Sequence, residues 1–520
     1  MDLSERINFL YMRIVDEIGL YDDYVSENLE QCIGEYYQLS QRLSEKLKDN
    51  MMYNLHQLID KTKKYTAIYL YSCCIAISCN NEICEEFLQY TIDNKEIGAN
   101  TRYFIYYQLK SIMFDNICLE TRHAKYLKWK LLDTVISEFR QELKDVLVKI
   151  PKGERNEKLA LVVTEQILGI EHGPTKTALD RSKAFMHSMG KTVLLVNTAE
   201  ILSARGGVSY FGLYKGSYDA SKIMQKSISW KGVEIPFFQC ENNMPNIADI
   251  RILLQMVQRI MPGIVVSIGG SSVVSNLIND IIPVLTIGLC PSDLEATMTK
   301  CQTLGRTLSN EDKELLLRMG MDETSVIESV FTSSLQPQSR KVTRREMGLP
   351  EDKFVIAVVG GRLDLDIDQD FAEILKKVAR DDVCIACIGK FDRYAQFIKD
   401  NPELQICLRS LGFTNEILAW IENCDLYVNP HRKGGGTSSV EALFKGIPVV
   451  TTSYGDVAIN VGSTFWVKSY DEMPEMIVRY KNDSDFYQMM SAKARKRAER
   501  LLNTEKEFVR IVEEFRKRCD

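Results

Sequence analysis

A glycine-rich segment near the C-terminus combines a strand end, a loop and a helix entrance in a pattern that suits anion binding. Residues 426–428 are apolar and predict a short strand, Pro430 ends it, and apolar residues at helical spacing follow Gly436. A helix entrance offers free backbone N–H groups and the positive end of the helix dipole, and glycine lets an anion approach the backbone closely. The residues from His431 to Lys433 add positive charge at the rim. The candidate binding residues are His431, Lys433, Gly434, Gly435, Gly436, Thr437, Ser438 and Ser439.

The same segment has a structural interpretation. Glycine-rich turns are common before helices, and Ser438 and Glu441 have the spacing of a capping box. In that interpretation Glu441 only stabilises the start of a helix. The local pattern leaves both interpretations open.

The wider pattern around this loop resembles the donor-binding signature of GT-B glycosyltransferases, mainly those of the family-four type. The matching residues are Pro430, Gly434 to Gly436, Glu441, Ala442 and residues 446–450. The resemblance implies that Glu441 binds the ribose hydroxyls of a nucleotide sugar. A second Glu of the family lies eight positions earlier and contacts the donor sugar. Lys433 occupies that position here, so the resemblance implies a nucleotide site without extending to the sugar or the stereochemical outcome.

A second loop of the family pattern follows the predicted strand 354–359. In the family a Gly-Arg-Leu sequence places its Arg near the donor diphosphate, and the resemblance therefore adds Gly361 and Arg362 to the donor-binding residues. The family often has a Lys a few residues later, where this chain has three aspartates between residues 364 and 368, and Lys390 is a candidate to supply that charge instead. We interpret the aspartates as a solvated acidic loop and not as a metal site. GT-B enzymes usually work without a metal, so no cofactor is expected, and the nucleotide sugar is a co-substrate, with a UDP-sugar favoured.

His172 is the predicted catalytic residue. Residues 159–164, 174–189 and 192–196 predict a strand, a helix and a strand, and this unit resembles the opening of the N-terminal GT-B domain. His172 lies on the loop that follows the first strand, where it should face the cleft, and an imidazole titrates near neutral pH. A positioning or packing role for His172 stays open.

Alternating strands and helices predict an α/β fold with two Rossmann-like, doubly wound domains (GT-B) behind an all-α domain. The predicted domains are residues 1–155 (helical), 156–340 (N-terminal, acceptor side) and 341–520 (C-terminal, donor nucleotide, with terminal helices). Strands are predicted at 159–164, 192–196, 233–238, 264–268, 281–287, 354–359, 383–388, 404–408, 426–428 and 447–451. Residues 291–350 are polar and predict an irregular segment between domains. Ligands bind at the carboxyl ends of parallel strands, so the glycine-bearing loops should meet at one cleft.

The first 155 residues predict helices only, and they are rich in tyrosine. They could bind an acceptor or partner protein, form a homo-oligomer, or simply pack on the neighbouring domains. Their position resembles the layout of cytoplasmic glycosyltransferases that modify bacterial adhesins.

Bulk composition narrows the classes of function. The 520 residues are 45% hydrophobic, with a net charge of −6 and 14 scattered cysteines. These values predict a globular protein with reduced thiols that does not bind nucleic acid. The N-terminus lacks a signal segment, and the longest apolar run, residues 65–79, is short for a membrane span. We therefore expect a cytoplasmic protein without a transmembrane segment.

Two functions compete at this stage. The first is a nucleotide-sugar-dependent, hexosyltransferase-like glycosyltransferase that acts on a protein or a glycan. The second is a catalytically silent GT-B subunit that binds a partner glycosyltransferase or a substrate protein. A nucleotide-sugar epimerase on the same fold is a third, weaker alternative.

Overall fold

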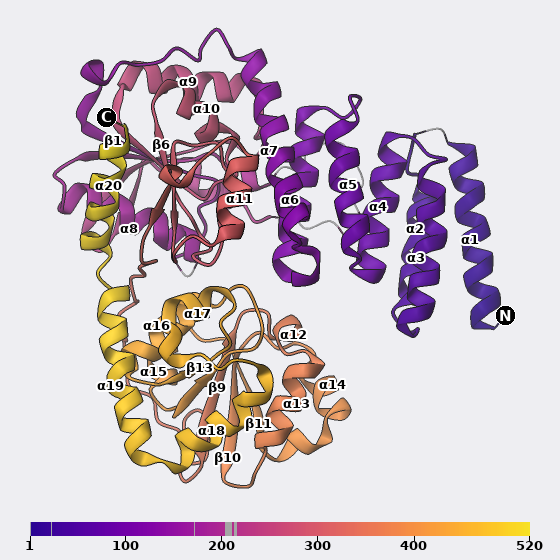
Figure 1. The fold of residues 1–520 in the computed structure, drawn as a ribbon, viewed down its shortest axis with the longest axis vertical. Coiled ribbons are helices and arrows are strands. Elements are labelled where there is room, and N and C mark those ends of the chain that lie inside the picture. The colour runs from indigo at the N-terminus through magenta and orange to yellow at the C-terminus, as the bar shows by residue number, and fades with distance from the viewer. Residues whose placement is uncertain (1, 22, 171, 203–210, 213–215, 520) are drawn as a thin grey trace.

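The computed structural model describes residues 2–519 except 22, 171, 203–210 and 213–215. Within these residues the chain forms a row of helices and two α/β domains (Figure 1). The two α/β domains are stacked, and the row of helices projects sideways from the first of them (Figure 1). The predicted fold class, two doubly wound domains behind a helical segment, is confirmed.

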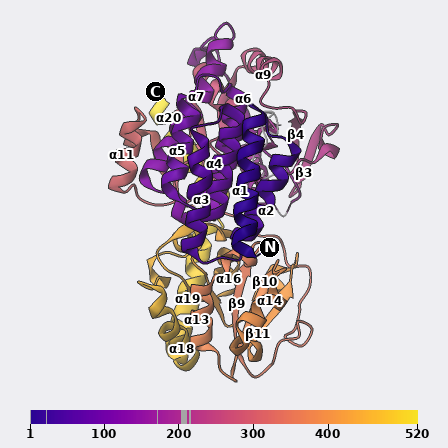
Figure 2. The same ribbon diagram turned by 90° about the vertical axis from the view of Figure 1, so that its right-hand side faces the viewer.

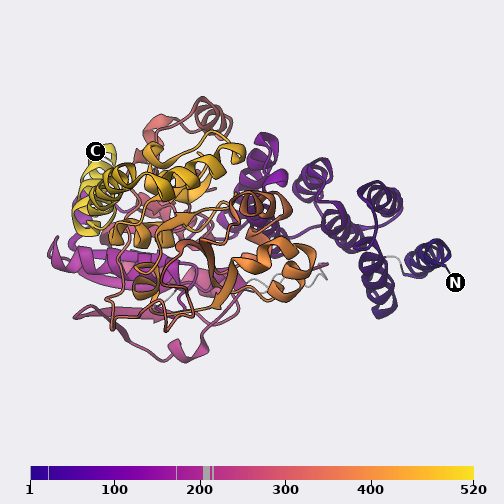
Figure 3. The same cartoon turned by 90° about the horizontal axis from the view of Figure 1, so that it is seen from below.

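The helical row contains seven α-helices. They are α1 (Leu3–Leu20), α2 (Glu27–Ser40), α3 (Glu45–Ile59), α4 (Lys64–Ser78), α5 (Asn81–Asp93), α6 (Ala99–Asp115) and α7 (Arg122–Glu142). Side chains of Asp2, Ser26 and Asn80 accept hydrogen bonds from first-turn N–H groups, which explains where α1, α2 and α5 begin. Seen from below, α1 lies farthest from the α/β domains (Figure 3).

Helix α7 attaches the row to the first α/β domain. The Trp129 indole N–H donates to the carbonyl of Thr297 at 3.0 Å, and Arg140 pairs with Asp280 at 2.6 Å. Buried side chains of the row and of the first domain form one hydrophobic cluster. Figure 2 looks along the row, with the first domain behind it and the second domain below. The row is therefore packed on the first domain through α7, and Phe211 of that domain also contacts Tyr37 on α2 and Tyr69 on α4.

The first α/β domain has an eight-stranded sheet in the order β3-β4-β2-β1-β5-β6-β7-β8. Its strands are β1 (Asn156–Thr164), β2 (Thr192–Asn197), β3 (Ser227–Trp230), β4 (Val233–Gln239), β5 (Pro262–Ile268), β6 (Val284–Ile287), β7 (Cys301–Leu304) and β8 (Val326–Glu328). All neighbours are parallel except the β3–β4 hairpin. The helices are α8 (Gly173–His187), α9 (Ile247–Ile260), α10 (Val273–Ile281) and α11 (Asn310–Arg318).

One prediction for this domain is wrong. Residues 291–350 were expected to be irregular and the sheet to end with residues 281–287, but β7, α11 and β8 extend it. These strands have four and three residues, which is too short for a clear periodic pattern. They form because they pair in parallel with β6 and with each other.

The second α/β domain has a five-stranded parallel sheet in the order β11-β10-β9-β12-β13. Its strands are β9 (Phe354–Gly360), β10 (Val383–Gly389), β11 (Leu408–Gly412), β12 (Leu426–Val428) and β13 (Val449–Val450). Its helices are α12 (Leu363–Asp366), α13 (Gln369–Val378), α14 (Tyr394–Asp400), α15 (Ile417–Ile421), α16 (Gly436–Lys445) and α17 (Gly455–Val461). The strand predicted at 404–408 is wrong, because Pro402 starts a short 3-10 helix and β11 begins only at Leu408.

The C-terminal helices connect the two α/β domains. Helices α18 (Met473–Asn482) and α19 (Ser484–Leu501) belong to the second domain, and α19 packs on α16. Helix α20 (Thr504–Cys519) crosses to the first domain and packs on α8 (Figure 1). There the rings of Phe508 and Phe185 meet edge to face at 4.9 Å. The end of the chain thus returns to the first domain.

Candidate active site in the cleft between the two sheets

The larger of two adjoining cavities lies at the carboxyl ends of the second sheet and measures about 330 Å³. Its walls come from the end of β9, the end of β10, residues 413–418 and the first turns of α16. The first turn of α8, in the other domain, closes one side with Gly173 and Lys176. This volume and position are typical of a site for a small molecule in a doubly wound protein.

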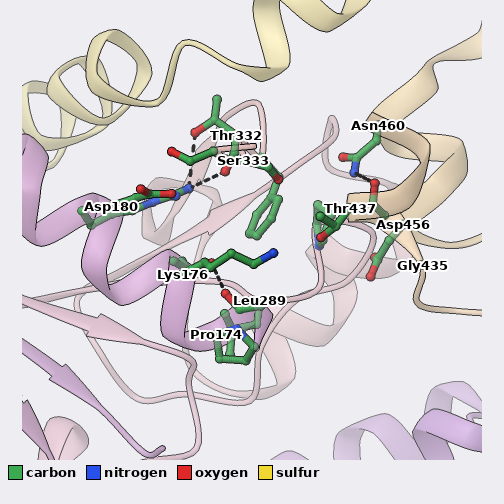
Figure 4. Close-up of a pocket in the computed structure, with 17 residues that line it drawn as sticks. Pro174, Lys176, Asp180, Leu289, Thr332, Ser333, Gly435, Thr437, Asp456 and Asn460 are labelled. Atoms are coloured by element: carbon green, nitrogen blue, oxygen red, sulfur yellow. Dashed lines mark hydrogen bonds between the residues drawn. The ribbon is translucent and has the colours of Figure 1, made fainter. Parts of the chain in front are cut away.

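The smaller cavity, of about 180 Å³, lies between the first turns of α8 and α16 (Figure 4). Gly173, Lys176, Gly435, Gly436 and Thr437 line both cavities. The two spaces therefore form one cleft that passes between the helix entrances of the two domains.

The entrance of α16 has the open backbone that the glycines predict. Gly435 precedes the helix with a φ of 91°, which residues with a Cβ rarely adopt, and no side chain caps the helix. A Cβ on Gly436 would lie 2.7 Å from the Asn460 amide nitrogen, which donates to the carbonyl of Gly436 at 3.0 Å. The N–H groups of this turn are thus held at the cleft without a side chain in front of them. An anion fits such an entrance.

The capping-box interpretation of Ser438 and Glu441 is wrong. Helix α16 begins at Gly436, so Glu441 lies in its second turn, and the Ser438 hydroxyl donates to the carbonyl of Gly435 at 2.9 Å. Ser439 likewise bonds the carbonyl of Gly436 at 2.7 Å. Thr437 and Ser438 line the larger cavity, whereas Ser439 is buried under the turn.

Glu441 is a buried carboxylate that lines the larger cavity. Glu441 is only 8% exposed, and its carboxylate makes no hydrogen bond with any described residue. Burial raises the pKa of Glu441 to about 7, while Lys176 across the cavity acts in the opposite direction. An acceptor group of this kind is available to a ligand's hydroxyls.

Arg432 fixes the loop before α16 to the end of β9. Its guanidinium donates to Asp366 and to the carbonyl of Val359, both at 2.7 Å, and to the Tyr427 hydroxyl at 2.9 Å. The expected solvated acidic loop is therefore wrong at Asp366, which is buried in this ion pair. Asp368 accepts from the first turn of α13 at 2.8 Å and is a helix cap. No group of three His, Cys, Asp or Glu side chains in the described parts of the chain is arranged to hold a metal ion.

Lys433 is turned away from both cavities. It is 8% exposed and pairs with Glu120, between α6 and α7, at 2.7 Å and with Asp293, in the first α/β domain, at 2.6 Å. Burial opposes its charge, but Asp293 and Glu120 outweigh burial and raise the pKa of Lys433 well above its usual range. The predicted donor-binding Lys433 thus joins three parts of the chain instead of reaching the cleft.

Gly361 and Arg362 line the larger cavity, as the resemblance implied. The Arg362 guanidinium also pairs with Asp115 at the end of α6 and lies 4.9 Å from the centre of the Phe114 ring. Gly434 faces the same Phe114, because a Cβ there would lie 3.2 Å from that ring. Arg362 therefore shares its charge with the helical row.

Lys390 and His431 lie outside both cavities. Lys390 is exposed and pairs with Asp392 at 3.1 Å. The His431 ring stacks on Tyr454 with centres 4.6 Å apart, and burial lowers the pKa of His431. Neither residue is brought to the donor position that the sequence suggested.

His172 precedes α8 at the edge of the cleft. Its Nδ1 lies 2.9 Å from the Thr175 hydroxyl, and its neighbour Gly173 lines both cavities although His172 itself lines neither. Burial, and secondarily Lys176, lowers the pKa of His172 to about 4. The ring is therefore neutral at pH 7, the form that can accept a proton. The preceding residue, Glu171, lies outside the described residues.

Sequence reasoning missed four residues of the cleft. Lys176 extends into it from α8 (Figure 4) and forms no ion pair with any described residue. Asp456 is buried, accepts from the Ser292 hydroxyl at 2.7 Å, and has its pKa raised to about 7 by burial. Phe413, 70% exposed, lines the larger cavity, and Arg181 the smaller one. The sequence could have indicated Lys176, because it lies in the first turn of a predicted helix that follows a Gly-Pro loop. No sequence pattern indicates that Asp456, Phe413 or Arg181 lies in the cleft.

Comparisons with known proteins agree with this geometry. Residues 355–483 match the family model described as "Glycosyl transferases group 1". An O-GlcNAc transferase mutant from Thermobaculum terrenum aligns with 100% of this chain and 98% of its own, at 12% identity and a TM-score of 0.54. A glycosyltransferase from Rickettsia africae aligns with 70% of this chain and 99% of its own, at 12% identity and a TM-score of 0.50. A search of curated proteins finds no match.

The protein therefore has the GT-B fold. Within its second α/β domain, residues 355–483 match the group 1 glycosyltransferase model. No helix in the described part of the chain is long and apolar enough to cross a membrane.

Proposed function

We propose that the protein transfers a sugar from a nucleotide sugar, with UDP-sugars favoured, to an acceptor that is a protein or a glycan. The observation that carries the proposal is Glu441, an unpaired buried carboxylate that faces the larger cavity next to the open entrance of α16. A carboxylate can accept two ribose hydroxyls, while the helix entrance takes the diphosphate beside it. The preference for UDP comes from the family resemblance.

The remaining groups of the cleft fit such a donor. The exposed Phe413 lines the larger cavity and offers a ring on which a base can stack. Lys176 lies where the two cavities meet and can neutralise the charge that grows on the leaving diphosphate. The donor sugar then lies in or next to the smaller cavity, between the two α/β domains.

In an inverting transfer an acceptor oxygen attacks the anomeric carbon as the bond from that carbon to the diphosphate oxygen breaks. The electrons of the broken bond stay on the diphosphate, and the acceptor proton goes to a base. We assign that role to His172, whose imidazole is neutral at pH 7. His172 directly precedes Gly173, a residue that lines both cavities. We also propose that no metal takes part, because Lys176 and the α16 entrance supply the positive charge.

The direct test is calorimetry of the full chain in EDTA with UDP, ADP, GDP and CDP. We expect UDP to bind, and Glu441→Gln to weaken binding with little change in melting temperature. Because Glu441 does not cap α16, a loss of stability without a loss of affinity is not expected. Failure of every nucleoside diphosphate to bind would remove the basis of the proposal.

A catalytically silent subunit is the second candidate, and one observation favours it. Lys433 stands where the family has a sugar-binding Glu, and its charge is used up by Glu120 and Asp293. Hydrolysis of UDP-glucose and UDP-N-acetylglucosamine separates the candidates, because a silent subunit binds the nucleotide without releasing UDP over hours. We further propose that the end of the helical row that carries α1, the helix farthest from the α/β domains, binds the acceptor or a partner protein.

A further inference from the structure

Arg181 is a buried cation with part of its hydrogen-bonding capacity unused. It lies on α8, is 4% exposed, and lines the smaller cavity. Its Nη2 donates to the carbonyl and the hydroxyl of Thr332, at 3.0 and 3.3 Å. Its Nη1 is buried and has no partner among the described residues. A buried guanidinium with a free N–H donor is costly unless a ligand completes it.

No carboxylate of the described protein lies within ion-pair distance of this guanidinium. The adjacent Asp180 accepts from the Trp230 indole N–H at 2.9 Å and lies 3.6 Å from the Lys231 ammonium, so its charge is used on the other side. Burial lowers the pKa of Arg181 to about 10, with Asp180 acting weakly against burial. The missing counter-charge points to an anion that arrives with a ligand.

The surroundings of Arg181 suit an anion more than a neutral group. Lys176, on the same helix, lines the same cavity and has no ion pair with any described residue. Residues 332–334 add hydroxyl groups to the same wall. On the opposite wall Asp456 is held by Ser292, and its raised pKa weakens its repulsion of an anion near neutral pH. Two cations thus face a cavity whose two acids are already engaged.

We propose that Arg181 and Lys176 bind an oxyanion of the substrate, a phosphate or a carboxylate, in the smaller cavity. The proposal rests on the proposed function for the identity of the substrate and narrows its class. Lys176 lines both cavities and so reaches a group at their junction, whereas Arg181 lines only the smaller one. The anion is then either the phosphate nearest the sugar or an acidic group on the sugar itself, such as the carboxylate of a uronic acid.

The test compares the full-length protein with Arg181→Gln in calorimetry with inorganic pyrophosphate, UDP, UDP-glucose and UDP-glucuronate. Lys231→Gln is the matched control, because it also removes a cation next to Asp180 but lies outside both cavities. We expect Arg181→Gln to weaken binding about ten- to a hundredfold, as for a lost charged hydrogen bond, and Lys231→Gln to leave it unchanged.

The pattern of losses identifies the anion. Equal losses for pyrophosphate, UDP and both UDP-sugars assign the site to the diphosphate, and a loss confined to UDP-glucuronate assigns it to a sugar carboxylate. Unchanged affinities in Arg181→Gln, or equal losses in Lys231→Gln, overturn the proposal. If pyrophosphate binds through Arg181 but no nucleotide binds, the anion site stands and the proposed function fails. Should Arg181→Gln not fold, Arg181→Lys, which keeps the charge and loses the planar donors, is read by the same criteria.

Discussion

The two walls of the cleft differ in how the protein treats their cations. On the second domain, Arg432 lines the larger cavity but is buried in an ion pair with Asp366, and the adjacent Lys433 is turned away from the cleft toward Glu120 and Asp293. On the first domain, Lys176 and Arg181 have no carboxylate within ion-pair distance among the described residues. A cation that the protein has already neutralised contributes little to binding an anion. The wall formed by the first domain, with Lys176 and Arg181, therefore has more positive charge available to a ligand than the wall formed by the second domain.

The neutralised wall has a different role, which is to hold three parts of the chain together. Glu120 receives Lys128 at 3.1 Å as well as Lys433, and Asp293 receives Lys125 at 3.0 Å. Phe114 lies between Arg362 and Lys433, 4.9 and 5.9 Å from their charged groups. The helical row therefore contacts the donor loops of the second domain through this cluster. GT-B domains that need to move relative to each other would have to break it.

The largest effect that sharpens the comparison is expected on the first-domain wall, at His172. His172→Ala should lower turnover by about 10²–10⁴ if His172 is the base, with UDP affinity close to wild type. His187→Ala is the control, because His187 lies at the far end of the same helix and pairs with Glu505. Near-normal turnover in His172→Ala would redirect the search for a base to Asp456, a buried acid of the smaller cavity whose pKa is raised to about 7.

The next effect concerns stability on the neutralised wall. Lys433→Met leaves Glu120 and Asp293 without their shared partner. Because Lys128 and Lys125 still pair with them, the cost should stay below the about 3–5 kcal/mol of a buried charge left with no partner. We expect a clear fall in the urea midpoint for Lys433→Met and almost none for Lys390→Met, since Lys390 is exposed. If Lys433→Met is as stable as wild type but no longer binds nucleotide, Lys433 binds the donor and does not serve to hold the parts of the chain together.

Lys176 should show the opposite behaviour. Lys176→Gln removes a charge that no described residue pairs with, so stability should hold while affinity for UDP-glucose falls by about ten- to a hundredfold. Lys183→Gln is the control on the same helix. Lys183 lines neither cavity, and its ammonium pairs with the Glu505 carboxylate at 2.9 Å. Equal affinity losses in both variants would mean that the general charge of α8, and not the position of Lys176, attracts the donor.

Local sequence patterns predicted the fold and the entrance of α16. They did not predict the features of the site that depend on pairing between residues far apart in the sequence. Gly435 and Gly436 form the open helix entrance that their spacing predicts, because a positive φ and a missing Cβ are local properties. Lys433 was assigned to the donor because it adds positive charge directly before the glycines, yet its partner Glu120 lies 313 positions away and no local pattern indicates that pairing. The prediction of the helix cap failed as well: Ser438 and Glu441 have the spacing of a capping box, but the N-cap of α16 is Gly435, three residues before Ser438.

Glu441 offers the finest test, because its effect on binding depends on pH in a direction that the structure fixes. With a pKa raised from 4.5 to about 7, Glu441 is largely protonated at pH 6 and ionised at pH 8. Only the ionised form accepts two ribose hydroxyls, so affinity for UDP-glucose should rise about tenfold per pH unit below 7 and level off above it. The stability of the unliganded protein should respond in the opposite sense: a carboxyl whose pKa is raised on folding stabilises most below its unfolded pKa, and this contribution is lost as pH rises through 7.

UDP-glucose is preferred to UDP as the ligand in this measurement because its diphosphate has no free terminal phosphate to titrate. Glu441→Gln should abolish the rise and leave the shallow fall that ionisation of Asp456, next to the anion, produces. A rise that survives in Glu441→Gln would show that another group titrates, and Glu441 would then have no part in binding the ribose.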